Sequence, residues 1–298
     1  MQPLTIGMPV YNGAETIERA LRSLLDQTFA HFDLIVSDNA STDATAMIAE
    51  EIAKTDQRVR TIRHPQNLGA TANFMSLVRS AKTTLFMWAA CDDEWHPDYI
   101  AECKKILDAD SSVGFSGGQV VSIDPRGTVL RTCRPFDGLD DPNASVRAAR
   151  FASMREAAGK ANLFYSIYRT PIIQAVCADD HIMDGWGSDM GLVTAVLSRT
   201  KYRAAETTLY KRVTSDSDIA TSKALAAGDY RATQYDGGFP PDRFGAYLRT
   251  MTRGVQGAIP RTAVRGILLA RRLSLFRWQI RQKAAGAKRR VGRLLSRA

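Results

Sequence analysis

Short apolar runs alternate with amphipathic segments over the first 110 residues. Four runs have the length and composition of buried strands, and they occupy residues 4–10, 32–37, 59–64 and 84–90. The segment after the first run has five apolar residues at helical spacing: Ile17, Ala20, Leu21, Leu24 and Leu25. Helices are also expected from about residue 44 and over residues 70–80. This alternation predicts an α/β fold with a mostly parallel sheet flanked by helices on both faces.

Polar and turn-forming residues follow each of the four predicted strands. The loops are residues 9–13, 38–43, 67–69 and 92–93. In open α/β sheets, ligands bind beyond the carboxyl ends of the strands. The sequence therefore predicts one ligand site built from these four loops.

The second half of the chain is less regular. Two strands joined by an Asp-Pro-Arg-Gly turn are expected over 114–131, a helix over 143–158 and a strand over 163–168. A glycine-rich loop from Asp184 leads into another helix, and strand-like residues end at 213. Residues 214–242 have the composition of a connector, and no internal repeat is visible.

Charge is distributed unevenly along the 298 residues. Residues 243–298 hold 15 Lys or Arg and no Asp or Glu, whereas the first 242 residues have a net charge of −6. A basic tail on an acidic body predicts an anionic partner for the tail. Four widely spaced cysteines without a CxxC pair, no secretory pattern at the start and no long apolar stretch predict a cytoplasmic protein with reduced thiols.

Four stretches of the first 100 residues resemble, in order, the motifs of the family 2 glycosyltransferases. They are "MPVYNGAETIERALRSLLDQTF", "LIVSDNASTDAT", "HPQNLGATANF" and "MWAACDDEWHPDYI". The resemblance implies a GT-A (Rossmann-like) fold and an inverting transferase with a nucleotide-diphospho-sugar donor. It implies a catalytic domain over 1–213, with residues 1–110 binding the donor and 111–213 binding the acceptor. The implied nucleotide is UDP, with GDP or dTDP as alternatives. The implied acceptor is a lipid-linked or polysaccharide hydroxyl in cell-surface glycan synthesis.

Several residues of the donor half are candidates for contacts with the nucleotide sugar. Asp38 ends the second strand and can accept a hydrogen bond from a base N–H, although an Asx-turn or helix-cap role is the alternative. Asp43 fits a structural capping role better. The remaining candidates are Pro9, Tyr11 and Asn12 for the nucleoside, Asn67 and Gly69 in the Asn-x-Gly loop, Asp92, and Arg212 for the phosphates.

The adjacent carboxylates Asp92 and Asp93 are the candidate metal ligands. Mn²⁺ or Mg²⁺ prefers carboxylate and phosphate oxygens, and could stabilise the departing diphosphate. The alternative is that the two residues favour the start of a helix. Ala90 stands where the family often has a further Asp, and Thr214 stands where many relatives have a His, so metal binding would rest on these two side chains.

An inverting transfer needs a general base for the acceptor hydroxyl. The segment "GWGSDMGL" resembles the loop that carries this base in the family, which makes Asp189 the candidate and Asp184 its rival. Ser188 replaces the Glu that often precedes the base. A helix-cap role is the alternative for Asp189. Trp186 could stack on a sugar or belong to the core.

The tail from Ala284 onward has an apolar face and a basic face, the pattern of a helix lying on anionic lipid. Residues 243–298 are therefore predicted as a basic helical extension at the inner face of the cell membrane. A solvated tail or a helix packed on the body is the alternative. No nucleic acid partner is expected, since the body has no matching motif, and the absence of G-x-G-x-x-G disfavours a dehydrogenase. A catalytically weak nucleotide-sugar-binding scaffold is the alternative function.

Overall fold

The computed structural model describes residues 4–124, 126–133, 136–154, 159–185, 187–213 and 244–273. Its first half contains four parallel strands in the order β3-β2-β1-β4. They are β1 (Leu4–Val10), β2 (Phe32–Asp38), β3 (Val59–Arg63) and β4 (Leu85–Trp88). The connecting helices are α1 (Ile17–Leu25), α2 (Thr45–Thr55) and α3 (Ala70–Ser80). Strand and helix order thus agree with the prediction.

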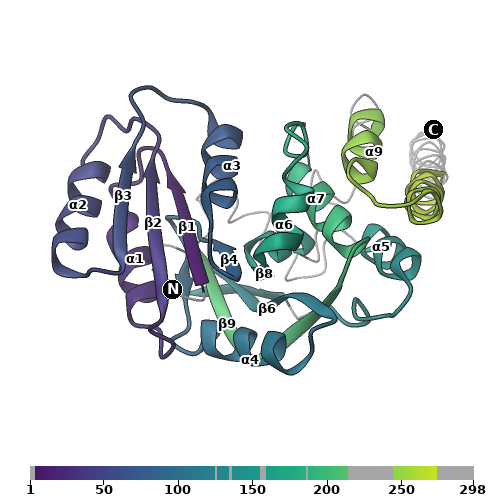
Figure 1. The fold of residues 1–298 in the computed structure, drawn as a ribbon, viewed down its shortest axis with the longest axis horizontal. Coiled ribbons are helices and arrows are strands. Elements are labelled where there is room, and N and C mark those ends of the chain that lie inside the picture. Colours follow the sequence, from purple (N-terminus) through teal and green to yellow (C-terminus); the bar gives the residue numbers. More distant parts are fainter. Residues whose placement is uncertain are drawn as a thin grey trace, which may run out of the picture.

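Helices cover both faces of these strands, with α1 and α2 on one side and α3 on the other (Figure 1). Successive strand residues point to opposite faces. Ile35 and Phe86 accordingly pack into the cluster that contains α3, whereas Leu34 and Met87 pack into the cluster that contains α1. Because both faces of β1, β2 and β4 are buried, these strands read as largely apolar runs, whereas the edge strand β3 is buried only at Val59.

The other strands of the sheet are of mixed direction. They are β5 (Glu94–Trp95), β6 (Val113–Ile123), β7 (Val129–Cys133), β8 (Ile167–Arg169) and β9 (Lys201–Val213), with α4 (Tyr99–Ala109) between β5 and β6. The full order is β3-β2-β1-β4-β8-β6-β9-β5, and β7 pairs with β6. β8 is antiparallel to both β4 and β6, whereas β6 and β9 are parallel. Parallel pairing thus joins β3, β2, β1 and β4 and, separately, β6 and β9.

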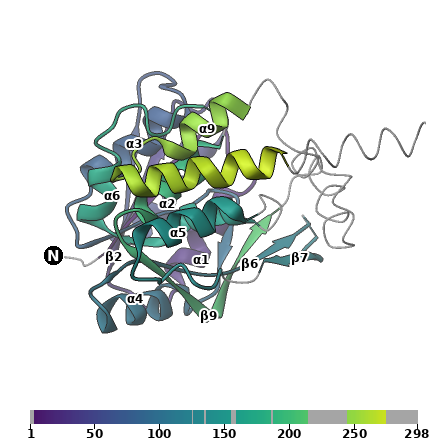
Figure 2. The same cartoon turned by 90° about the vertical axis from the view of Figure 1, so that its right-hand side faces the viewer.

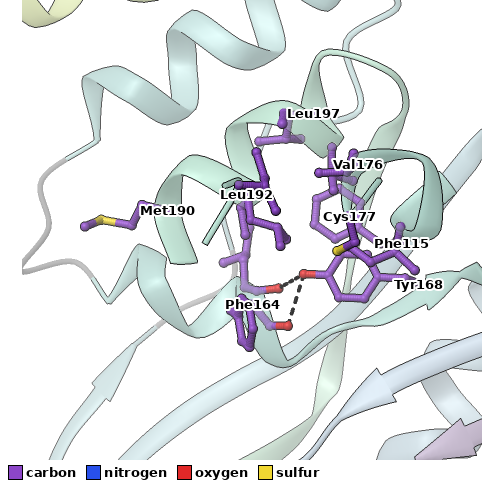
Figure 3. Packing of buried hydrophobic residues seen from close by; sticks show 14 of the residues in the cluster. Phe115, Phe164, Tyr168, Val176, Cys177, Met190, Leu192 and Leu197 are labelled. Carbon is purple, nitrogen blue, oxygen red and sulfur yellow. Dashed lines mark hydrogen bonds between the residues drawn. The ribbon is translucent and has the colours of Figure 1, made fainter. Parts of the chain in front are cut away.

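The strand predicted over 163–168 is wrong over its first four residues. Residues Lys160–Tyr165 form a 3-10 helix, η2, and the strand begins only at Ile167. Gly159 precedes η2 with a φ of 82°, and the Tyr168 hydroxyl donates to the carbonyl oxygens of Leu163 and Phe164 at 2.7 and 3.1 Å (Figure 3). A short apolar run that is buried on all sides does not distinguish a strand from a helical turn.

The helices of the second half are α5 (Ala144–Ser153), α6 (Thr170–Val176), α7 (Ser188–Leu197) and α9 (Phe244–Thr252), followed by a helix that is described over 258–273. Helix α7 is buried all along Met190–Leu197, and its Leu192 and Leu197 lie in the core around Phe115 and Tyr168 (Figure 3). Asn143 caps α5 by accepting the backbone N–H of Ser145 at 2.8 Å.

The described part of the basic tail packs on the body. Tyr247 and Met251 of α9, and Val264 and Leu268 of helix 258–273, are fully buried in the same core as α7. Figure 2 shows helix 258–273 running between α9 and α5 across one side of the molecule. The packing alternative therefore holds for 244–273, whereas the connector 214–242 and the amphipathic stretch after Ala284 lie outside the described residues. None of the described helices is long and apolar enough to cross a membrane.

Candidate functional site

Hydrogen bonds join the loop after β1 to the loop after β2. Asn12 has a left-handed φ of 52°, accepts the Thr42 N–H on its Oδ1 at 2.9 Å and donates its own N–H to Ser41 Oγ at 2.9 Å. Pro9 is buried inside β1, whereas the Tyr11 side chain stands 49% exposed at the end of the strand. The loop is thus held rigid while it presents an aromatic ring to solvent.

Asp43 supports the same junction from the other side. Its carboxylate accepts the backbone N–H groups of Ala14 and Thr45 at 3.1 and 3.0 Å, and also the Thr45 hydroxyl. The Thr45 hydroxyl bond and the two amides lower the pKa of Asp43 below its ordinary value of 3.8. Asp43 thus binds the first amide of α2, although Ala44 is the N-cap residue itself. The predicted structural role fits these contacts.

Asp38 lies at the carboxyl end of β2 with its two oxygens in different situations. Oδ1 accepts the Ser41 N–H at 3.1 Å, which is the loop role considered from the sequence. Oδ2 is buried and has no hydrogen-bond partner among the described residues. Arg63 Nε forms an ion pair with Oδ2 at 3.3 Å without hydrogen-bond geometry, and the Arg63 guanidinium donates to the Ser41 carbonyl at 3.1 Å. A buried polar atom without a hydrogen bond is costly, so Oδ2 is suited to accept an N–H from a ligand.

The third loop is tied to the second by Asn39. Its side chain donates to Asn67 Oδ1 at 2.9 Å and to the Gly69 carbonyl at 3.3 Å, and accepts the Leu68 N–H at 2.8 Å. Asn67 Oδ1 also accepts the Gly69 N–H at 2.8 Å. Gly69 has a φ of 83° as the N-cap residue of α3, a conformation that favours glycine. Asn67 and Gly69 therefore shape the loop, with α3 starting directly behind it.

A second polar layer lies below Asp38. Ser37 Oγ donates to Asn73 Oδ1 at 2.5 Å and lies 3.0 Å from His64 Nε2, while Asn73 Nδ2 donates to the Ser37 carbonyl at 2.9 Å. These bonds fix α3 to the end of β2. Sequence reasoning missed Asn39, Arg63 and this layer, although Asn39 directly follows Asp38 and Arg63 ends the neighbouring strand.

The loop after β4 lies beside the loop after β1. Cys91 Sγ lies 3.2 Å from where a Cβ on Gly13 would stand, so only a glycine fits there without displacement. Burial and, to a lesser degree, Asp92 raise the pKa of Cys91 to about 12, so its thiol is neutral near pH 7. Asp92 is exposed and Asp93 is buried. Helix α4 starts only at Tyr99 with Asp98 as its N-cap, so the helix-start alternative for the two carboxylates is wrong.

Strand pairing brings Asp93 next to the end of β9. Glu94 pairs with Lys211 in an antiparallel ladder, and one further step in this register places the backbone of Asp93 opposite Arg212. The Arg212 side chain lies outside the described part of the chain. Hard oxygen ligands from Asp92 and Asp93 suit Mg²⁺ or Mn²⁺, which take their other ligands from phosphates and water. No cluster of three His, Cys, Asp or Glu occurs within the described ranges.

Asp189 belongs to a different element of the fold. It lies in the first turn of α7, half-buried, with Oδ1 accepting the Met190 N–H at 2.8 Å. Gly187 precedes it with a φ of 77°, and a Cβ there would approach the Tyr247 ring of α9 to 3.0 Å. The rival Asp184 is exposed, with its Oδ2 2.7 Å from His181 Nδ1. Trp186 lies outside the described residues.

The mixed sheet flanked by helices has the GT-A fold. Solved structures with this fold include residues 1–349 of S. aureus TarS in complex with UDP, with a TM-score of 0.53, 13% identity and coverage of 91% of both chains. The family model "Glycosyl transferase family 2" matches residues 5–161, more than half of the chain. The chain therefore belongs to glycosyltransferase family 2, as its motifs indicated.

Curated relatives match less than half of this chain. The chain is 28% identical over 123 residues to TuaG of Bacillus subtilis, named as a candidate glycosyltransferase of teichuronic acid biosynthesis, which covers 41% of this chain and 48% of TuaG. It is 29% identical over 114 residues to the glycosyltransferase GlyA of Streptococcus pneumoniae, which covers 37% of this chain and 16% of GlyA. The matched segments thus span half or less of the length of these relatives.

Proposed function

We propose that this chain is an inverting glycosyltransferase that moves a sugar from a nucleotide-diphospho-sugar to a hydroxyl of a lipid-linked or polysaccharide acceptor in cell-surface glycan synthesis. The observation that carries the proposal is the buried Asp38 Oδ2 at the carboxyl end of β2, which lies 3.3 Å from Arg63 Nε and accepts no hydrogen bond from the described residues. Family membership and the printed name of TuaG support it. UDP is the proposed nucleotide, since TarS structures are described in complex with UDP and with UDP-GlcNAc.

The chain's own residues would divide the work as follows. Asp38 accepts the base N–H, with Pro9, Tyr11 and Asn12 around the nucleoside and with Asn67 and Gly69 shaping the adjoining loop. Asp92 and Asp93 would hold Mn²⁺ or Mg²⁺, which when bound neutralises charge on the diphosphate. Arg212 adds positive charge at the same end of the sheet.

Asp189 would remove the proton from the acceptor hydroxyl. The hydroxyl oxygen then forms a bond to the anomeric carbon as the bond from that carbon to the phosphate oxygen breaks. The electron pair leaves with the nucleoside diphosphate, and the proton stays on the Asp189 carboxylate. A single displacement of this kind inverts the configuration at the anomeric carbon. We place the enzyme in the cytoplasm, peripheral at the inner membrane face through residues 243–298, whose sequence has no acidic residue.

The experiment compares Asp189→Asn with Asp184→Asn. Release of UDP from UDP-sugars is followed with and without Mn²⁺, and UDP binding is measured on each variant. Loss of a general base predicts a rate lower by about 10²–10⁴-fold for Asp189→Asn, with unchanged UDP binding and near-normal turnover for Asp184→Asn. A severe loss in Asp184→Asn alone would move the base to that residue.

The scaffold alternative makes a different prediction. Ala90 and Ser188 stand where the family often has acidic residues and Thr214 stands where many relatives have a His, and these three departures are its support. A scaffold would bind UDP but release none from any donor, with or without metal. Turnover that is abolished by a chelator and restored by Mn²⁺ would exclude it.

A further inference from the structure

Helix 258–273 has two apolar faces. One face holds Val264 and Leu268, which are fully buried against the body. The opposite face carries three large exposed side chains, Ile259 at 76%, Leu269 at 48% and Leu273 at 61% exposure. Between them lie the exposed residues Thr262, Gly266 and Ala270. We call these six residues the outer face.

The outer face is uncharged, and arginines border it. At about 100° per residue, the spacing of Ile259, Leu269 and Leu273 keeps them within one sector of the helix surface. Arg261, Arg265 and Arg272 fall along one flank of that sector. Figure 2 shows that helix 258–273 lies at the front of this side of the molecule, with α9 and α5 beside it.

Arg261, Arg265 and Arg272, which we call the rim, keep positive charge along this edge of the outer face. The Arg272 guanidinium lies 4.6 Å from the centroid of the Phe244 ring, and Arg261 donates to the Val255 carbonyl at 2.9 Å. Arg265 is exposed. No acidic residue occurs anywhere between 243 and 298, so no neighbour along this segment neutralises the rim.

We propose that the outer face inserts into an anionic lipid surface. An apolar stripe with flanking arginines is the pattern of a helix that lies in the plane of a bilayer interface. A second copy of the chain is a poorer occupant, because a symmetric contact would bring the two arginine rims toward each other. This inference rests on the membrane partner in the proposed function and names the residues that make the contact. It assigns the contact to a helix that the body holds in place.

The test is co-sedimentation of the full chain with lipid vesicles. Wild type is expected to bind vesicles of phosphatidylcholine with phosphatidylglycerol and to bind pure phosphatidylcholine far less. The triple variant Ile259→Ser, Leu269→Ser and Leu273→Ser is expected to lower the partition coefficient by about tenfold or more. The matched control is Met47→Ser with Val129→Ser, both 61% exposed elsewhere on the surface, which should bind as wild type.

A charge variant tests the rim separately. Arg265→Glu should remove most of the preference for phosphatidylglycerol, whereas Arg60→Glu, an exposed arginine on β3, should not. Unchanged thermal midpoints of the variants show that the fold is intact, since the altered side chains are exposed.

Three outcomes would overturn the inference. Wild type could fail to bind the anionic vesicles. The triple variant could bind them as tightly as wild type, which would mean that residues outside the outer face make the membrane contact. Sedimentation equilibrium could show a dimer that the triple variant dissociates, with vesicle binding unchanged. Vesicle binding needs neither donor nor metal, so each result is independent of UDP binding and turnover.

Discussion

Arg63 Nε lies 3.3 Å from Asp38 Oδ2, and this oxygen nonetheless accepts no hydrogen bond from the described residues. The two residues are the last of β3 and β2 and are paired in the parallel register. The Asp38 side chain is only 3% exposed and that of Arg63 is 58% exposed. A nearby cation makes a buried carboxylate less costly. Arg63 therefore stabilises the Asp38 charge, while Oδ2 still lacks a hydrogen-bond donor among the described residues.

Arg63→Ala is expected to weaken UDP binding by about 3- to 10-fold, because Asp38 loses its countercharge and Ser41 loses a donor to its carbonyl. The Arg63 guanidinium can also donate a hydrogen bond to a base carbonyl that stands next to the N–H accepted by Asp38, as in uracil. Cytosine has an amino group in place of that carbonyl. The Arg63→Ala substitution should therefore weaken CDP binding less than UDP binding. Calorimetric titration of both nucleotides measures the effect.

Arg60→Ala is the matched control for this prediction. Arg60 lies on the same strand and pairs with Asp33 of β2 at 3.4 Å, near the amino ends of the two strands. Its loss should leave both affinities unchanged. Equal losses of UDP and CDP affinity in Arg63→Ala would show that the residue only supports the loop.

Asp43 predicts an acid-sensitive contribution to stability. Its folded-state pKa is lowered below 3.8, chiefly by the Thr45 hydroxyl. The stabilisation is therefore fully present above the unfolded-state pKa and is lost as the pH falls through the folded-state value. The thermal midpoint of Asp43→Asn should lie below that of wild type at about pH 6, and the gap should narrow toward about pH 3. A gap of constant size over this range would contradict the assignment.

Two glycines test whether the C-terminal helices belong to the folding unit. A Cβ on Gly191 of α7 would lie 2.6 Å from the Thr250 carbonyl oxygen of α9. Gly191→Ala should therefore lower the free energy of unfolding by about 1–3 kcal/mol through overpacking. Gly266 of helix 258–273 has no heavy atom within 4 Å of such a Cβ, so Gly266→Ala should raise stability by about 0.5–1 kcal/mol.

Urea unfolding of the two alanine variants measures the difference. If α9 packs on α7 as described, the variants move in opposite directions. A Gly191→Ala variant as stable as wild type would mean that α9 does not pack against Gly191 of α7, the helix that carries Asp189.

Local signals predicted the elements of the first 110 residues well. Helix α3 spans Ala70–Ser80 as expected, and Asp38 stands out from the sequence because it ends an apolar strand. Arg63 and Asn39 could not be found in this way, because their contacts depend on how neighbouring strands align. The same holds for β8, which inserts antiparallel between β4 and β6.

The C-terminal region shows a different limit of sequence reasoning. Its uniform basic charge favoured a surface helix, with packing on the body as the alternative, and Val264 and Leu268 are buried in the core. Over 163–168, apolar composition alone suggested a strand where the chain first makes the 3-10 turn η2. In both places the packing partners, which are distant in sequence, decide the structure.

The central claim is that Asp38 Oδ2 receives the base of a nucleotide. Calorimetric titration of UDP with Mn²⁺ into wild type, Asp38→Asn and Asp33→Asn tests it most directly. Asparagine keeps the Oδ1 acceptor for Ser41 but can present an N–H donor in place of Oδ2. UDP affinity should fall by about 10- to 100-fold in Asp38→Asn and stay unchanged in Asp33→Asn, which alters the other β2 aspartate. Equal UDP affinity in all three proteins, or no binding to wild type, would contradict the account.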